Sequence, residues 1–171
     1  KLMILTANHC VEFDPGETNG EFVYSSPSGP VTGNLDVSRL GTEKYDLALL
    51  EVKDGLTSDM GRAALSTLAP KGFEYHLGQE VYNASNLWGQ IKGAVLIGRI
   101  SYKSWTIPEG EVLDFIDIPI RPGSSGSSVQ MRIKGRTRIT GVIVRGDMRS
   151  FGLSVPLAKI HEWLYISDAK V

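Results

Sequence analysis

The chain of 171 residues is long enough for one sizeable domain or for two small subdomains that share a core. Its formal net charge of −1 argues against a nucleic-acid-binding module held by bulk electrostatics, so we expect no nucleic-acid partner. No apolar run approaches the roughly 20 residues of a membrane span, so we expect no bilayer crossing. Cys10 is the only cysteine, which excludes a disulfide within the chain and favours an intracellular, bacterial or viral setting over a small secreted animal protein.

Short apolar segments recur along the chain between Gly, Pro, Asn and Ser, a pattern typical of strands joined by turns. In chain order, the expected strands are Lys1–Ala7, Glu21–Tyr24, Leu47–Val52, Glu80–Ala84, Ile91–Ser101, Val112–Ile118, Val129–Ile133, Thr137–Arg145 and Phe151–Val155. The segment Gly55–Pro70 has no clean period, so we expect it to carry the chain between two halves. Two alternating runs meet at Gly135, which predicts a hairpin turn.

The tail of the chain is the one good helix candidate. We expect Pro156 in its first turn, with Leu157, Ile160, Trp163 and Leu164 on one face. Many short strands followed by one terminal helix predict an all-β barrel or sandwich.

His9 lies at the end of the apolar segment Ile4–Cys10. A general base needs an imidazole that is fixed in position yet reachable by substrate, and the end of a strand provides both. A lone histidine is more often a surface residue or a hydrogen-bonded structural residue, so His9 is significant only together with other motifs.

Asp46 directly precedes the apolar run Leu47–Leu50. A carboxylate at the mouth of a buried strand can accept a hydrogen bond from the far nitrogen of a catalytic histidine and fix its tautomer. The alternative is an ordinary turn aspartate before a strand.

The Gly/Ser-rich segment Gly123–Ser128 is short and lies between two apolar strands, and Pro122 stiffens its entrance. Glycines let successive N–H groups turn toward one point, so the amides of Gly123 and Ser125 are candidates for holding an oxyanion. The Ser125 hydroxyl becomes a nucleophile once a neighbouring base takes its proton. The alternative is a flexible Gly/Ser loop.

Together, the three motifs resemble the chymotrypsin/trypsin-like serine protease superfamily, whose pattern is Thr-Ala-x-His, then Asp-x-Ala-Leu-Leu, then Gly-x-Ser-Gly. The order His9, Asp46, Ser125 matches that family and differs from the orders in subtilisins and α/β-hydrolases. The compact spacings are similar to those of bacterial high-temperature-requirement proteases and viral chymotrypsin-like proteases. The resemblance implies that these residues form a catalytic triad that hydrolyses a polypeptide substrate without a cofactor or a metal.

The resemblance extends over nearly the whole chain. Gly141–Gly146 resembles the strand that lines the specificity pocket, and Gly152–Pro156 with the tail resembles the last strand and closing helix. It implies a single all-β domain over 1–171, built from two antiparallel six-stranded β-barrels with the active site in the cleft between them. The expected parts are an N-terminal barrel over 1–70, a C-terminal barrel over 71–155 and a helix over 156–166.

Several residues depart from the family pattern. The family's first strands have no counterpart here, so we expect an incomplete first barrel and interpret the chain, which begins at Lys1 within a strand, as a fragment or processed product. A larger assembly or an additional chain that completes the barrel stays open as a partner. Ser124 stands where zymogen-activated members carry an aspartate that pairs with a new N-terminus, which argues against that activation. Ser127 replaces the second glycine of the Gly-Asp-Ser-Gly-Gly form, which favours a bacterial, phage or viral source.

The family resemblance also implies a set of substrate-binding residues. They are Ile118, Ile120, Val144, Arg145, Gly146 and Gly152. These walls are mainly apolar, which favours an uncharged hydrophobic residue at the cleavage position. Ile143 stands where glutamate-specific relatives place a histidine, which argues against that specificity. Arg145 either reaches an acidic substrate group or, as the more ordinary case, points to solvent.

Two other groups of residues carry weaker hypotheses. Basic side chains alternate through the hairpin around Gly135, and a strand places several of them on one face. They are Arg132, Lys134, Arg136 and Arg138. A solvated face explains them better than a phosphate or RNA contact. His76 and His161 do not lie in a metal-ligand spacing, so we expect no metal site.

The leading hypothesis is a serine endopeptidase that cleaves peptide bonds through an acyl-enzyme. The alternative is a catalytically silent protease-like fold that serves as a structural or binding module in a virus particle or larger assembly, which the incomplete first barrel motivates. The intact set of His9, Asp46 and Ser125 counts against that alternative. An esterase with the same triad is chemically open, but no sequence feature favours it.

Overall fold

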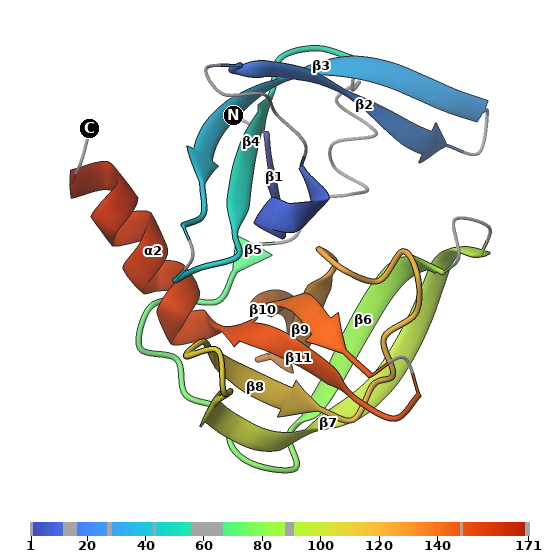
Figure 1. Ribbon diagram of the computed structural model, residues 1–171. Coiled ribbons are helices and arrows are strands. Elements are labelled where there is room, and N and C mark those ends of the chain that lie inside the picture. Colours follow the sequence, from blue (N-terminus) through green and yellow to red (C-terminus); the bar gives the residue numbers. More distant parts are fainter. Residues whose placement is uncertain are drawn as a thin grey trace.

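The computed structural model describes residues 2–11, 17–26, 29–42, 44–55, 67–87, 91–147 and 149–169. These residues form two largely antiparallel sheets, one above the other in Figure 1, with an α-helix along one side. None of the described residues belongs to a helix with the length and apolar character that a bilayer crossing requires.

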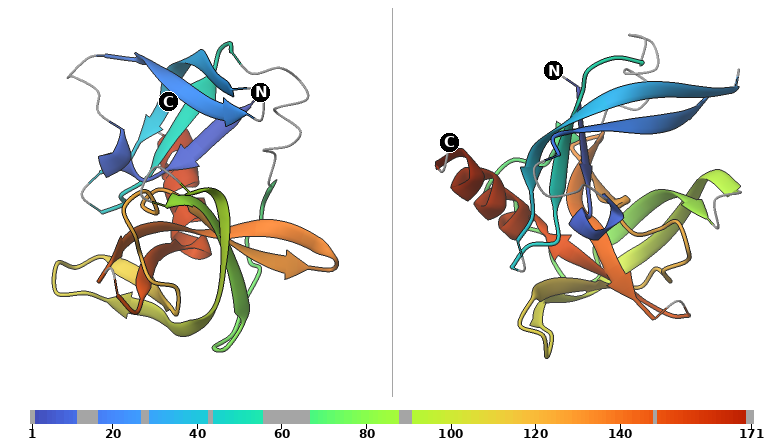
Figure 2. Two further views of the ribbon diagram at one scale, coloured as in Figure 1. Left: turned by 90° about the vertical axis from the view of Figure 1, so that its right-hand side faces the viewer. Right: turned by 45° about the horizontal axis from the view of Figure 1, so that its top comes forward.

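The first sheet is open. Its strands are β1 (Met3–Thr6), β2 (Asn19–Ser26), β3 (Gly29–Leu40) and β4 (Ala48–Val52). They lie in the order β1-β4-β3-β2, and among the described residues no pairing joins β1 to β2. The buried side chains of Leu47, Ala48 and Leu50 anchor β4. β2 and β3 form a long hairpin that extends away from the rest of the molecule (Figures 1 and 2).

The second sheet closes on itself. Its strands are β5 (Thr67–Leu68), β6 (Glu80–Leu87), β7 (Ile91–Thr106), β8 (Val112–Ile116), β9 (Ser128–Ile133), β10 (Arg136–Gly146) and β11 (Gly152–Pro156). They follow the order β11-β8-β7-β6-β9-β10, and β10 also pairs with β11, so six strands form a barrel. β5 adds a short parallel pairing to β10. Apolar side chains fill the barrel interior, including Val81, Ile100, Ile116, Val129, Met131 and Ile143.

A further apolar cluster joins the two sheets to the helix α2 (Leu157–Ala169), which follows β11 directly. Leu47 comes from the first sheet, Val142 and Val155 from the barrel, and Ile160 from α2. Removing this apolar surface from water stabilises the junction by about 25 cal/mol per Å². The cluster therefore fixes how the two sheets sit relative to each other.

The structure confirms an all-β fold with a C-terminal helix and corrects details of the sequence prediction. The sequence pattern does not predict a strand at Gly29–Leu40, because Gly, Pro and Asn within it are typical of turns. Pairing with β2 on one side and β4 on the other overrides that local preference. The predicted hairpin at Gly135 is confirmed between β9 and β10. Pro156 ends β11 opposite Gly141 rather than opening the helix.

The segment expected to connect the two halves is described only in part. Residues 56–66 lie outside the described residues, and Thr67–Leu68 at its end forms β5.

Candidate active site

His9 is held just beyond β1 by a 3₁₀ turn, Asn8–Cys10. The Cys10 amide donates to the carbonyl of the fully buried Ala7 (3.1 Å). Two further bonds join this turn to Asp46, because the Asn8 amide donates to the Asp46 carbonyl (3.2 Å) and the His9 amide donates to Asp46 Oδ1 (2.9 Å). The main chain thus fixes His9 and Asp46 relative to each other.

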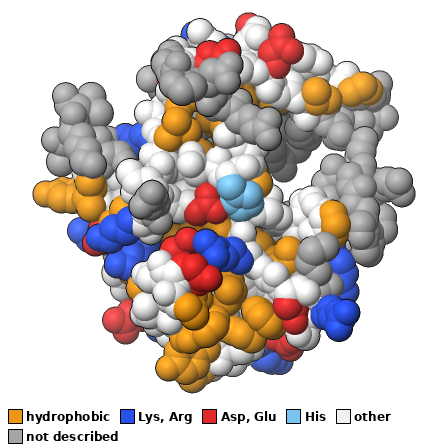
Figure 3. Space-filling model, in the orientation of Figure 1, with side chains coloured by type: hydrophobic (Ala, Val, Ile, Leu, Met, Phe, Trp, Pro, Cys, Tyr) orange, Lys and Arg blue, Asp and Glu red, His pale blue; other side chains and the backbone are white. Residues whose placement is uncertain are grey.

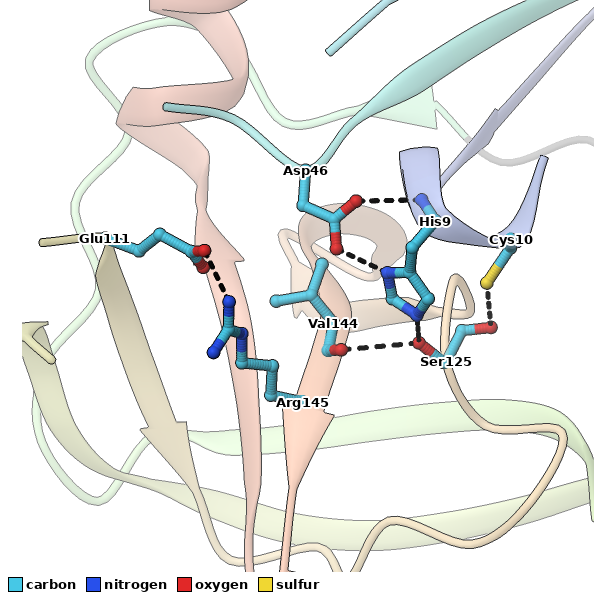
Figure 4. A network of polar contacts seen from close by, with 7 residues as sticks. All are labelled: His9, Cys10, Asp46, Glu111, Ser125, Val144 and Arg145. Carbon is cyan, nitrogen blue, oxygen red and sulfur yellow. Dashed lines mark hydrogen bonds and ion pairs between the residues drawn. The ribbon is translucent and has the colours of Figure 1, made fainter. Parts of the chain in front are cut away.

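Asp46, His9 and Ser125 form a continuous hydrogen-bond chain across the junction of the two sheets (Figure 4). His9 Nδ1 donates to Asp46 Oδ2. Because a carboxylate only accepts, Nδ1 carries a proton, and in the neutral imidazole the lone pair is then on Nε2. The Ser125 Oγ lies 2.6 Å from that Nε2. In this arrangement a histidine can take a proton from a hydroxyl while a carboxylate stabilises the resulting imidazolium.

The hydrogen-bond chain is reachable from solvent. The His9 side chain is 47% exposed and that of Asp46 is 22% exposed. Figure 3 shows a histidine at the surface on this face, with acidic and basic side chains beside it and hydrophobic side chains gathered over the barrel below. A base that is fixed yet exposed meets both requirements for general base catalysis.

The loop that carries Ser125 is held by backbone hydrogen bonds at both ends. At its start, the Ser124 amide donates to the Arg121 carbonyl (2.9 Å). At its end, the Gly126 amide donates to the Ile143 carbonyl on β10 (2.7 Å). The segment predicted either as a nucleophile loop or as a flexible tract is therefore a folded turn pinned to the barrel wall.

The amides of Gly123 and Ser125 have no acceptor among the residues that the structure describes. Gly123 has φ +91°, a conformation that favours glycine. Within the described part of the chain, neither amide donates to an acceptor. Two such N–H groups beside a hydroxyl are the donors that an oxyanion site requires.

Gly126 brings the loop into contact with the first sheet. It has φ +86°, and a Cβ at this position would overlap Thr6 Oγ1 and lie 3.3 Å from the Ala7 nitrogen. Only glycine therefore lets the loop approach so closely. Next to it, the Cys10 thiol donates to the Ser125 carbonyl (3.4 Å), and partial burial raises the pKa of this thiol, which keeps it protonated.

The predicted pocket residues border the site, and Ile120 occupies the space between them. The Val144 carbonyl oxygen lies 3.4 Å from Ser125 Oγ, whose one proton faces the nearer His9 Nε2. A Cβ added at Gly146 would overlap the Ile120 side chain, and one added at Gly152 would lie 2.9 Å from Ile120 Cδ1. Ile120 thus packs against both glycines and fills the space beside them.

Ile118 lies deeper than its expected role requires. Its side chain is 1% exposed and packs in the barrel interior, in the same apolar cluster as Ile143. The structure therefore brings Ile120, Gly146 and Gly152 together, places the Val144 carbonyl beside Ser125 Oγ, and places the Ile118 side chain in the core.

Arg145 is engaged within the protein. Its Nη2 lies 2.6 Å from Oε1 of Glu111, the residue before β8, as Figure 4 shows. The side chain remains 42% exposed, in line with the more ordinary expectation, and its charge is paired with Glu111 rather than left free for an acidic substrate group.

A buried polar cluster supports the strands that flank Glu111. The Tyr75 hydroxyl donates to the Asp114 carboxylate, which also accepts from the Ser104 amide (2.9 Å). Burial raises the pKa of the Asp114 carboxyl. The Lys103 ammonium also joins the cluster, because it donates to the Tyr75 carbonyl (2.6 Å). The cluster ties β8 to β7 and to the segment before β6.

Sequence motifs miss two contributors near the site. Asn83 on β6 is 1% exposed, and its Nδ2 donates to Ser127 Oγ and to the Ser128 carbonyl, both at 2.8 Å. Glu111 neutralises Arg145 from the loop before β8. The only sequence signal for Asn83 is a polar residue within an apolar strand.

Solved structures of proteases share this fold. A variant of the HtrA-type protease AlgW, solved with a tripeptide, superimposes with a TM-score of 0.67 at 18% identity over 95% of this chain. This chain spans about half, 51%, of that protein. The thermostable serine protease AL20 from an extremophilic microorganism superimposes with a TM-score of 0.65 at 16% identity, over 97% of this chain and 84% of the AL20 chain. Deg5 superimposes with a TM-score of 0.63 at 18% identity, over 94% of this chain and 75% of the Deg5 chain.

Sequence comparison identifies the family. A search of curated proteins gives no match. The family model of the trypsin-like peptidase domain matches residues 1–136, which is most of the chain. This protein therefore belongs to the trypsin-like peptidase family of serine proteases.

Proposed function

We propose that this protein is a serine endopeptidase that hydrolyses peptide bonds through an acyl-enzyme on Ser125. The observation that carries the proposal is the hydrogen-bond chain from Asp46 through His9 to the Ser125 hydroxyl. A hydroxyl is a weak nucleophile until a base takes its proton, and His9 Nε2 is placed 2.6 Å from that oxygen. The family match supports the same chemistry.

The mechanism has two half-reactions. In the first, Ser125 Oγ bonds to the peptide carbonyl carbon as its proton passes to His9 Nε2, and His9 then gives this proton to the leaving amine as the C–N bond breaks. In the second, His9 takes a proton from water as the water oxygen bonds to the acyl carbon, and returns the proton to Ser125 Oγ as the acyl C–Oγ bond breaks and the carboxylic acid product leaves. Asp46 holds His9 in the required tautomer throughout.

The backbone amides of Gly123 and Ser125 stabilise the oxyanion that forms in each half-reaction. Their lack of acceptors within the described residues leaves both available for this role. Loss of one such donor costs other serine proteases about 10²- to 10³-fold in kcat.

The pocket geometry favours a small uncharged side chain at the cleaved position. Ile120 packs against both Gly146 and Gly152, so its side chain limits the space beside these glycines. We therefore expect small aliphatic side chains at the cleaved position, whereas an aromatic ring would have to displace Ile120.

Peptide cleavage provides the test. We would incubate the wild type and Ser125→Ala with a denatured protein and a peptide library, and identify products and acid-quenched adducts by mass spectrometry. We expect cleavage after small aliphatic residues and a trapped acyl group on Ser125. Ser125→Ala should fold as stably as the wild type and cleave nothing. Cleavage by Ser125→Ala at the wild-type rate would overturn the proposal.

A further inference from the structure

We propose that Asn83 is a positioning residue for the oxyanion site, acting through the Ser127 hydroxyl on the peptide bond that carries the Ser125 amide. The catalytic consequence rests on the function proposed above. The structural part rests only on the hydrogen bonds described next.

Asn83 donates both of its side-chain amide protons to the nucleophile loop, Gly123–Ser128. It is 1% exposed in the barrel wall, and Nδ2 donates to Ser127 Oγ and to the Ser128 carbonyl at 2.8 Å each. The Ser128 carbonyl only accepts, so the nitrogen rather than the oxygen of Asn83 must face it. The Asn83 oxygen has no partner among the described protein groups. The contacts of this side chain are thus those of a donor aimed at one loop.

Ser127 in turn holds the carbonyl of Ser124. Because Ser127 Oγ accepts from Asn83, its own hydroxyl proton is directed elsewhere, and it donates to the Ser124 carbonyl. The Ser127 amide donates to the same carbonyl (3.1 Å). The Ser124 oxygen is therefore held by two donors on one side.

The held carbonyl sets the direction of the Ser125 amide. The Ser124 carbonyl and the Ser125 N–H belong to one peptide unit, which is planar and trans, so the two groups point in opposite directions. Fixing the carbonyl toward Ser127 turns the N–H away from the loop interior, where it donates to no acceptor among the described residues. The Asn83 amide thereby orients one of the two proposed oxyanion donors.

Ser124 itself is neutral in this arrangement. It is 1% exposed, and its hydroxyl accepts from the Arg121 amide (3.1 Å). The described contacts of Ser124 contain no ion pair, so neutral hydrogen bonds hold the loop. The Asn83–Ser127 link supports the loop from β6, beside the hydrogen bonds that join Gly126 and Ser127 to Ile143 on β10.

The test is a set of variants assayed with a peptide substrate, with rates normalised to titrated active sites. We expect Asn83→Leu to lower kcat about 10- to 100-fold with KM within about twofold, because a misdirected donor weakens transition-state binding only. The inhibition constant of a peptide aldehyde, whose adduct carries the oxyanion, should rise by a similar factor. The pH midpoint of kcat/KM should stay unchanged, since the His9–Asp46 contact is untouched.

Two further variants separate positioning from folding. Thr140→Val removes another buried polar group of the barrel, 2% exposed, that donates to the Val129 carbonyl and does not contact the loop. It should leave kcat and aldehyde affinity unchanged. Ser127→Ala should lower kcat about as much as Asn83→Leu does. The double variant should lose no more kcat than the more impaired of the two single variants, because both substitutions act on one carbonyl.

An NMR measurement decides the structural part independently of activity. The Ser125 amide proton should shift in Asn83→Leu and keep its position in Thr140→Val. An unchanged Ser125 amide with wild-type kcat in Asn83→Leu would overturn the inference, as would additive effects in the double variant. A wild type that neither cleaves nor binds the aldehyde would instead overturn the proposed function, and the amide shift would still decide the role of Asn83.

Discussion

The open sheet and the closed barrel contribute different halves of the candidate site. The sheet β1–β4 carries His9 and Asp46, the pair proposed to take and stabilise the proton, near its junction with the barrel. The barrel carries Ser125 and its neighbouring amides on a loop that is hydrogen-bonded to β10. In the barrel every strand of the closed ring has two neighbours, whereas the sheet depends on the shared apolar cluster for its placement. In the proposed mechanism, catalysis therefore depends on the contact between the barrel, which closes on itself, and the sheet, which the shared apolar cluster holds against it.

The largest expected effect comes from replacing the carboxylate that the sheet contributes to the site, while the fold of the sheet stays intact. Asp46→Asn should lower kcat by about 10⁴-fold, because an amide can donate to His9 Nδ1 and so favour the wrong tautomer. Steady-state kinetics on a peptide substrate measures this. Asp54→Asn is the matched control, since Asp54 lies in the same half of the chain and accepts from the Asn34 amide (3.0 Å) away from the site. Equal losses in both variants would contradict the assigned role of Asp46.

The next effect comes from the contact between the two parts. Gly126→Ala adds a Cβ that overlaps Thr6 Oγ1 at φ +86°, so the loop and the sheet must separate. We expect kcat to fall about 10²-fold, because misplacing catalytic groups by about 1 Å lowers the rate by about that factor in other enzymes. Gly135→Ala is the control at φ +78° with no atom near its Cβ, and it should cost only about 1 kcal/mol of stability. Comparable kcat values for the two variants would show that this contact does not position the triad.

A smaller effect is confined to the barrel's pocket. Ile120→Ala should open the space between Gly146 and Gly152 and raise kcat/KM for a substrate with phenylalanine at the cleaved position, relative to valine, by about tenfold. Competition between the two peptides measures the ratio directly. A ratio identical to that of the wild type would mean that Ile120 does not limit the pocket.

The smallest effect concerns how the free energy of unfolding changes with pH. Burial raises the pKa of Asp114 above its unfolded value of about 4, so its favourable contribution is complete below that pH and is lost as the pH rises through the folded pKa. In urea unfolding, Asp114→Asn should gain stability relative to the wild type as pH increases. Asp147→Asn should behave oppositely, because the hydrogen bonds from Ser150 lower the pKa of Asp147. Parallel pH curves for all three proteins would refute this account.

The sequence predicts those parts of the site whose signals are local. His9, Asp46 and the Ser125 loop each border an apolar strand, and their order resembles one family, so their meeting was expected. Asn83 lies 44 residues from Ser127 in the chain, and its role follows from the closure of the barrel rather than from any motif. β3 illustrates the same limit, because partners on both sides decide its conformation against its local turn residues.

The most direct test of the shared site is labelling with a fluorophosphonate, read by mass spectrometry, on the wild type, Ser125→Ala and His9→Ala. Because the probe reacts with an activated serine, we predict one adduct on Ser125 in the wild type, none in Ser125→Ala and strongly slowed labelling in His9→Ala. Labelling of His9→Ala at the wild-type rate, or a folded wild type that takes up no label, would contradict the claim that the sheet activates the barrel's serine.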